Sequence, residues 1–214
     1  MPTNSRSSFA RSMFGHLYRL VFQSAYRLMI RMGDWWEPLL QEASPASGER
    51  ILEVSVQGCR AYAKLARAYP TVSFFSLLRV GSKETKLKSP SNLEFLQGDQ
   101  YCIDCRASSF DKAICSLALH PLSQNEKLAF LREVRRVLRH GGMLYLADFD
   151  QPLRPQEMHV LRGTAHMLGP ETARRHLDGT WLELIRQAGF TGVRRMTTAS
   201  VIGGRIAIVR ARRP

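Results

Sequence analysis

The chain has 214 residues, of which 44% are hydrophobic and 23% are charged, a balance that suits a folded α/β domain with a sizeable core. No apolar run approaches the roughly 20 residues of a membrane-spanning helix, and no secretory signal with an apolar centre is seen, so a helical membrane protein is excluded. Four cysteines in a chain of this length predict a reducing compartment rather than a disulfide scaffold. Cys102 and Cys105 form one C-x-x-C pair without a second pair at zinc spacing, so no metal site is predicted.

The formal net charge of +13 comes mostly from the two ends of the chain. Residues 1–33 contain five Arg and no acid, and residues 191–214 contain six Arg and no acid. This distribution favours a basic surface patch, which an anionic membrane face or an acidic protein could bind. Nucleic acid is a weaker candidate, because no recognition helix is seen and aromatic residues do not alternate with the basic ends. A soluble protein with basic ends and no such partner is the alternative.

Residues 14–32 carry apolar residues at helical spacing, and Arg19, Arg27 and Arg31 lie on another side of the same predicted helix. This segment could lie on an anionic membrane, act as an Arg-rich organelle transit peptide, or pack over the domain. Residues 34–38 are expected to end the helix, and the small-residue stretch 41–48 reads as a linker. The sequence therefore predicts an N-terminal helix and linker over 1–48 and a main domain over 49–214. A cytoplasmic location, with or without membrane attachment, and an organellar one both fit.

The main domain alternates predicted strands and helices in chain order. The strands are expected at Ile51–Ser55, Thr71–Leu78, Leu93–Leu96, Phe110–Leu117, Met143–Phe149, Arg194–Ser200 and Arg205–Arg210. The helices are expected at Arg60–Tyr69, from a Ser123–Glu126 capping box to Gly141, at Pro155–Leu168 and at Glu171–Ala188. This order predicts an α/β fold: a three-layer sandwich around a mostly parallel seven-stranded sheet that ends in an antiparallel hairpin.

Several short stretches resemble one family when they are taken together and in order. They are Gly98-Asp99 after a short strand, FDKAICSLALH at 110–120, LREVRRVLRHGG at 131–142, MLYLADF at 143–149 and Ala188-Gly189-Phe190. This ordered set resembles the class I S-adenosylmethionine-dependent methyltransferases, most nearly the type-11 or quinone-biosynthesis kind. The resemblance implies a Rossmann-like methyltransferase fold, S-adenosylmethionine as cofactor and a small-molecule methyl acceptor.

On this resemblance, residues 51–59 are the position of the family's glycine-rich cofactor loop. Glu53 matches the acid of that motif, but its three glycine positions are held by Ser55, Gln57 and Cys59. The only glycine, Gly58, falls between them. Glycines in such loops let the backbone approach the ligand and adopt positive φ, which costs other residues on the order of 1 kcal/mol or more. The loop therefore predicts weakened or lost cofactor binding.

Two further residues bear on the cofactor. Asp99 matches the acid that contacts the adenine amino group in the family. Ser76, or Leu77 by a one-residue shift, stands where the family has an acid that holds the ribose hydroxyls, and a serine cannot offer a bidentate carboxylate. Half of the expected cofactor site is therefore retained, comprising Glu53 and Asp99, with Ser55, Gly58 and Ser76 as substitutes in the remainder.

Candidate catalytic and acceptor residues follow the fourth and fifth predicted strands. The resemblance places His120 at the mouth of the site as a general base or substrate contact, with a plain loop histidine as the alternative. Asp148 ends the strand 143–149, where it could contact substrate or cap the next turn. His159, Arg162 and His166 share one helical face, which could line an anionic acceptor's pocket or face solvent. Two functions stay open: a methyltransferase with an unusual cofactor loop, and an inactive pseudo-methyltransferase that binds a partner.

Overall fold

The computed structural model describes residues 35–55, 60–78, 89–99 and 101–214. These residues belong to one compact unit, Asp34–Pro214. The predicted amphipathic helix at 14–32 and the loop residues 56–59, including Gly58, lie outside the described residues.

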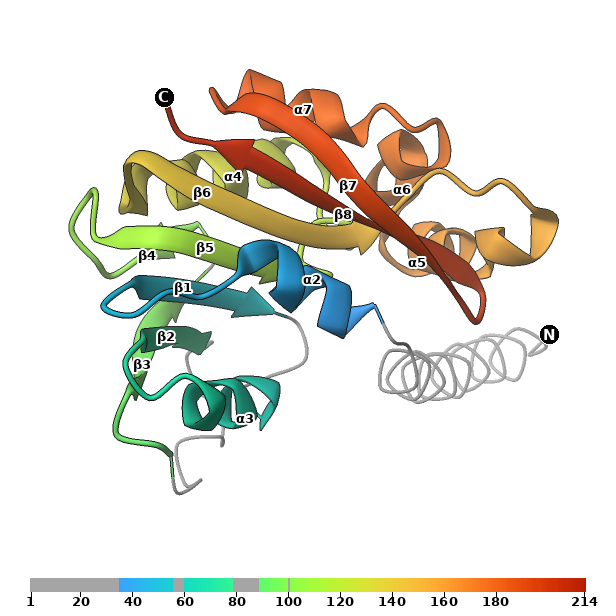
Figure 1. Ribbon diagram of the computed structural model, residues 1–214. Coiled ribbons are helices and arrows are strands. Elements are labelled where there is room, and N and C mark those ends of the chain that lie inside the picture. Colours follow the sequence, from blue (N-terminus) through green and yellow to red (C-terminus); the bar gives the residue numbers. More distant parts are fainter. Residues whose placement is uncertain (1–34, 56–59, 79–88, 100) are drawn as a thin grey trace, which may run out of the picture. The chain divides into compact units, whose positions relative to one another are not determined.

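The sheet confirms the predicted fold, with a parallel centre and an antiparallel end (Figure 1). Its strands run in the order β4-β3-β2-β1-β5-β6-β8-β7. The pairs among β3, β2, β1, β5 and β6 are parallel, whereas β8 is antiparallel to both β6 and β7. The bounds are β1 Arg50–Ser55, β2 Ser73–Leu78, β3 Leu93–Asp99, β4 Cys102–Ile103, β5 Phe110–Ser116, β6 Leu138–Phe149, β7 Thr191–Val201 and β8 Gly204–Arg212. The two-residue β4, which the sequence did not predict, extends the seven expected strands at the β3 edge.

Helices cover both faces of this sheet (Figure 1). One face carries α2 (Trp36–Ala43) and α3 (Arg60–Ala68), and the other carries α4 (Gln124–Val137) and α7 (Trp181–Gln187). The short η2 (Pro155–Met158), α5 (His159–Leu168) and α6 (Pro170–Leu177) follow β6 at the end to which its arrow points. That end is the carboxyl edge of the parallel strands, where open α/β folds place their ligands.

The main core lies under α4 and α7. The buried stripe of α4, Lys127, Phe130, Leu131, Val134 and Val137, follows helical spacing. It packs with Trp181, Leu184 and Ile185 of α7 against the inner residues of the sheet. The predicted capping box starts α4, since Ser123 Oγ accepts from the Glu126 amide and Glu126 accepts from the Ser123 amide.

Several predicted boundaries were wrong. The helix expected to reach Gly141 ends at Val137, because Leu138 is already extended and pairs with Phe110 at the start of β6. The single helix expected over 171–188 is two helices, interrupted around Gly179 with φ +76°. The first turn of the helix expected from Pro155 is a 3-10 helix.

Residues 36–43 form α2, a helix that the sequence did not predict, so the expected linker begins only after Ala43. Leu39 and Ala43 of this helix are buried. Trp35 just before it is only 2% exposed, so this segment packs within the same compact unit as the sheet. The division of the chain at residue 48 stays a prediction.

Candidate active site

The loop after β5 is held at the carboxyl edge of the sheet by one carboxylate. Leu117 takes φ +54°, a left-handed conformation that costs a non-glycine residue on the order of 1 kcal/mol. Asp148 is the second-last residue of β6. Its carboxylate accepts hydrogen bonds from the backbone amides of Leu119 at 2.7 Å, His120 at 3.3 Å and Phe149 at 2.8 Å. The bonds from Leu119 and His120 join the loop to β6 and fix the position of His120, and the bond from Phe149 orients the carboxylate within β6.

The side chain of His120 pairs with the same carboxylate. Its Nδ1 lies 3.0 Å from Asp148 Oδ1, and the two side chains are only 4% and 0% exposed. The imidazole packs edge-on against Phe149, with ring centroids 4.9 Å apart. Burial alone would raise the pKa of Asp148. The electrostatic interaction with His120, the hydrogen bond from His120, the nearby His176 and the hydrogen bond from the Leu119 amide together lower this pKa to about 2. Asp148 is therefore ionised at neutral pH and sets the orientation of the His120 ring.

A second set of buried polar side chains lies next to this pair. His176 of α6 has Nδ1 2.6 Å from the Phe149 carbonyl oxygen and stacks on Trp181. Trp181 Nε1 and Arg195 donate to Asp150 at 3.1 and 2.8 Å. Burial lowers the pKa of His176 to about 4, so its ring is neutral near pH 7.

Lys127 completes the buried set from α4, where its Nζ donates to the carbonyl oxygen of Thr172. Burial lowers its pKa to about 8, against an opposing attraction from Asp148. The sequence analysis missed both Lys127 and His176. A signal for Lys127 was present, since it falls on the apolar stripe of α4 with Phe130 and Leu131.

Two of the predicted cofactor residues meet across β1 and β2. Glu53 and Ser76 are register partners, both 1% exposed, and the Ser76 hydroxyl donates to Glu53 Oε2. Asp99 ends β3 and pairs through its backbone with Cys102, and Ser55 ends β1 beside Ser116. The side chains of Ser55 and Asp99 lie outside the described part of the structure.

Comparisons with known proteins agree with the fold described above. A family model described as a methyltransferase domain matches residues 56–146. The chain is similar in sequence to curated methyltransferases and similar in fold to solved S-adenosylmethionine-dependent methyltransferases. An uncharacterised methyltransferase of Synechocystis is 26% identical over 173 residues, which cover 81% of this chain and 80% of the relative. The ubiquinone/menaquinone biosynthesis C-methyltransferase UbiE of Syntrophotalea carbinolica is 25% identical, covering 75% and 76% of the two chains.

The solved structure of PigF with SAH has a similar fold to this chain. Its TM-score is 0.62 at 17% identity, and the match covers 95% of this chain. The chain spans only 60% of the length of that structure. These likenesses agree with the family that the ordered motifs predicted. Its cofactor is S-adenosylmethionine.

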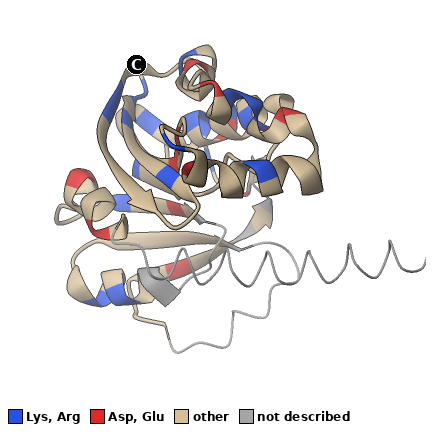
Figure 2. Cartoon of the chain, turned by 90° about the vertical axis from the view of Figure 1, so that its right-hand side faces the viewer, with Lys and Arg blue, Asp and Glu red and all other residues tan. Residues whose placement is uncertain are grey.

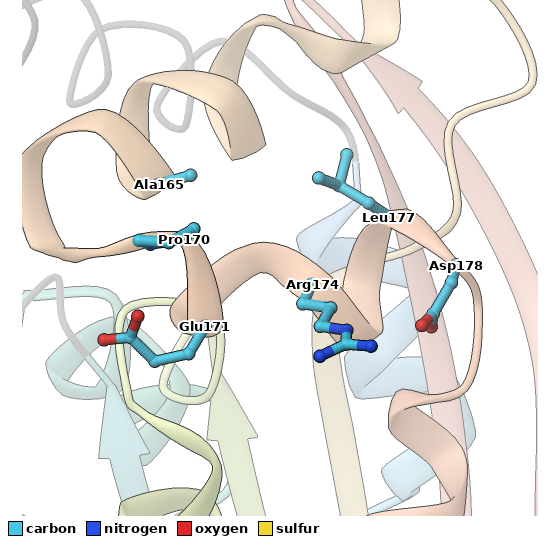
Figure 3. Close-up of a pocket in the computed structure, with 6 residues that line it drawn as sticks. All are labelled: Ala165, Pro170, Glu171, Arg174, Leu177 and Asp178. Atoms are coloured by element: carbon cyan, nitrogen blue, oxygen red, sulfur yellow. The ribbon is translucent and has the colours of Figure 1, made fainter.

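The acceptor-side residues predicted on α5 differ from the His120–Asp148 pair in their exposure to solvent. His159, Arg162 and His166 are all exposed, and His159 Nδ1 lies 2.6 Å from the Gln156 carbonyl oxygen. An open hollow of about 630 Å³ lies between α5 and α6, and none of these three residues lines it (Figure 3). Its lining residues are Ala165, Pro170, Glu171, Arg174, Leu177 and Asp178. A role in acceptor binding for the three α5 residues stays a prediction.

Neither a metal site nor a membrane-spanning helix is found in the part of the chain that the structure describes. No group of three or more His, Cys, Asp or Glu side chains there could hold a metal ion. Among the same residues, no helix is long and apolar enough to cross a membrane.

Proposed function

We propose that the chain is an S-adenosylmethionine-dependent methyltransferase that acts on a small-molecule acceptor and binds its cofactor weakly. The observation that supports this proposal best is the buried His120–Asp148 pair at the carboxyl edge of β5 and β6. Methyl transfer from a sulfonium depends mainly on holding the acceptor in line with the methyl group. A base adds to the rate when the acceptor is a hydroxyl or an acidic carbon.

The geometry suits His120 for the role of that base. Because Asp148 is ionised, it can accept a proton from Nδ1 of His120, an arrangement in which Nε2 would be the nitrogen that takes the proton from the acceptor. Three backbone amides hold the carboxylate in place. The pair is shielded from water, which strengthens the electrostatic interaction between its members.

The cofactor side supports weak rather than tight binding. Glu53 and Asp99, with Ser55, Gly58 and Ser76, are the residues that would hold S-adenosylmethionine, which supplies the methyl group when bound. The described residues fit it only in part. Ser76 donates its hydroxyl proton to Glu53, so the acid expected for the ribose is replaced by a group already engaged within the sheet. The substitutions at Gln57 and Cys59 reduce affinity further, on the argument from glycine given above.

The Glu53–Ser76 bond also favours the second candidate, an inactive pseudo-methyltransferase that binds a partner. Ser76 Oγ and Glu53 Oε2 are hydrogen-bonded to each other within the sheet, and this bond forms without a ligand. The two candidates differ in one observable property, the transfer of a methyl group.

Methyl transfer can be tested with methyl-labelled S-adenosylmethionine at millimolar concentration and the small-molecule extract of the source organism. The proposal predicts a labelled product, reduced about a hundredfold or more by His120→Gln. His140→Gln, which changes an exposed histidine near the start of β6, is the matched control and should retain the activity. No labelled product with the unaltered chain would favour the pseudo-methyltransferase.

A further inference from the structure

Two strongly exposed apolar side chains belong to neighbouring segments at the carboxyl edge of the sheet. Leu153, between β6 and η2, is 70% exposed, and Ile202, in the β7–β8 turn, is 71% exposed. These are the two largest exposures among the large hydrophobic residues that the structure describes. Isolated exposed hydrophobics are normal, but two from separate segments at one place indicate a contact surface.

Hydrogen bonds tie the two segments to each other. Glu157 accepts the Leu153 amide at 2.8 Å through one carboxylate oxygen and the Ser200 hydroxyl at 3.3 Å through the other. The Val160 amide donates to the carbonyl oxygen of Gly203 at 3.0 Å. The segment that carries Leu153 and the turn that carries Ile202 are thus joined through the Glu157 side chain and one backbone hydrogen bond.

The exposed charges around these two residues are basic. Arg154, His159 and Arg162 are exposed, and Glu157 is the only acid within 151–168 or 191–205. Glu157 is 6% exposed. Hydrogen bonds from the Leu153 and Arg154 amides lower its pKa, so its charge is already compensated inside the protein. Leu153, Arg154, His159, Arg162 and Ile202 are called the docking rim below.

The docking rim lies at the end of the sheet where a ligand would enter (Figure 1). The β6 arrow points towards η2 and the β7–β8 turn, and Figure 2 views the molecule from that end. We infer that the docking rim binds an anionic phospholipid surface, with Leu153 and Ile202 entering the interface and the arginines contacting lipid phosphates. This inference concerns attachment and does not depend on methyl transfer.

A lipid surface suits the chemistry of the rim better than a folded protein partner. Two protruding aliphatic side chains without a surrounding apolar surface offer little area for a protein interface, which needs about 800 Å² on each partner. Inserting aliphatic carbons into a bilayer needs no matched cavity, and each arginine near an anionic surface adds attraction. Charge complementarity therefore selects an anionic bilayer over a neutral one.

The test is co-sedimentation of the full chain with phosphatidylglycerol-containing vesicles and with pure phosphatidylcholine vesicles. The docking rim predicts binding to the former, weakened about tenfold or more by the double change Leu153→Ser/Ile202→Ser. Arg154→Gln/Arg162→Gln should weaken it about fivefold or more, and about 0.5 M salt should remove that part of the attraction. The predicted amphipathic segment 14–32 is present in every variant and contributes equally.

Matched controls lie elsewhere on the same surface. Leu168→Ser changes an aliphatic residue that is 47% exposed at the far end of α5, and Arg132→Gln removes an exposed charge from α4. Both should bind vesicles as the unaltered chain does, with unchanged melting temperatures for all variants. The inference is overturned if the unaltered chain fails to bind anionic vesicles. It is overturned equally if Leu153→Ser/Ile202→Ser binds them as tightly as Leu168→Ser.

Discussion

Ser76 donates its hydroxyl proton to Glu53 although the two residues are 23 positions apart. They face each other in the parallel register of β1 and β2, at the edge where the family seats its cofactor. The bond links the side chains of the two neighbouring strands and engages the hydroxyl proton of Ser76 within the sheet.

Ser76→Ala is expected to lower the free energy of unfolding by about 1–3 kcal/mol, because the buried Glu53 carboxylate loses a donor. Urea denaturation measures this change. Ser73→Ala, at the exposed start of the same strand, should stay within about 0.5 kcal/mol of the unaltered chain. Equal stability of the two variants would contradict a structural role for the Ser76 hydroxyl.

Asp148→Asn is expected to lower the free energy of unfolding by roughly 3–5 kcal/mol at pH 7, since the buried carboxylate serves three amides and His120. The folded pKa of about 2 lies below the ordinary 3.8, so this stabilisation is present above pH 3.8 and is lost as the pH falls towards 2. Glu183→Gln breaks a half-exposed pair with Arg186 and should change stability by no more than about 1 kcal/mol. Similar losses in both variants would argue against the Asp148 network.

His176 is expected to make stability depend on pH between about 4 and 6.5. Its folded pKa of about 4 lies below the ordinary 6.5, so the unfolded state binds more protons in this range and stability rises with pH. The rise amounts to at most about 3 kcal/mol. His176→Asn keeps a donor for the Phe149 carbonyl but does not titrate. Urea denaturation at several pH values should therefore give a smaller slope for this variant, and identical slopes would contradict a buried neutral ring.

Lys127 gives the corresponding effect in alkali. Its folded pKa of about 8 lies below the ordinary 10.5, so stability rises with pH from about 8 to 10.5 as the lysine loses its proton in the folded state. Lys127→Met should remove this rise, which amounts to at most about 3 kcal/mol, while adding a constant loss from the unpaired Thr172 carbonyl. A rise that persists in the methionine variant would show that another group causes it.

The order of the sheet could be predicted because it depends on short-range patterns. Apolar runs such as 110–116 and the Ser123–Glu126 capping box are local signals, and both appear in the structure at the expected places. The break between α6 and α7 could not be predicted in this way, because residues 171–188 carry helical spacing throughout. There, Gly179 at φ +76° packs against Gln151 from a distant loop.

The candidate site, like the fold, could be predicted from the sequence only in part. His120 and Asp148 could be proposed singly, since each follows a strand, but their pairing depends on the left-handed turn at Leu117. The burial of His176 depends on its stacking against Trp181 of α7, a contact between helices that no local pattern shows. The Ser76–Glu53 bond likewise requires the register of β1 and β2.

The most direct test is calorimetric titration of the chain with S-adenosylmethionine. Retention of Glu53 and Asp99 beside a substituted loop predicts binding with a dissociation constant between about 10 μM and 1 mM. Gln57→Gly should tighten it about tenfold, because the resemblance puts residue 57 at a glycine position of the cofactor loop, where a long side chain would compete with the methionine part. An absence of heat at millimolar ligand, for both the unaltered chain and Gln57→Gly, would contradict the methyltransferase assignment.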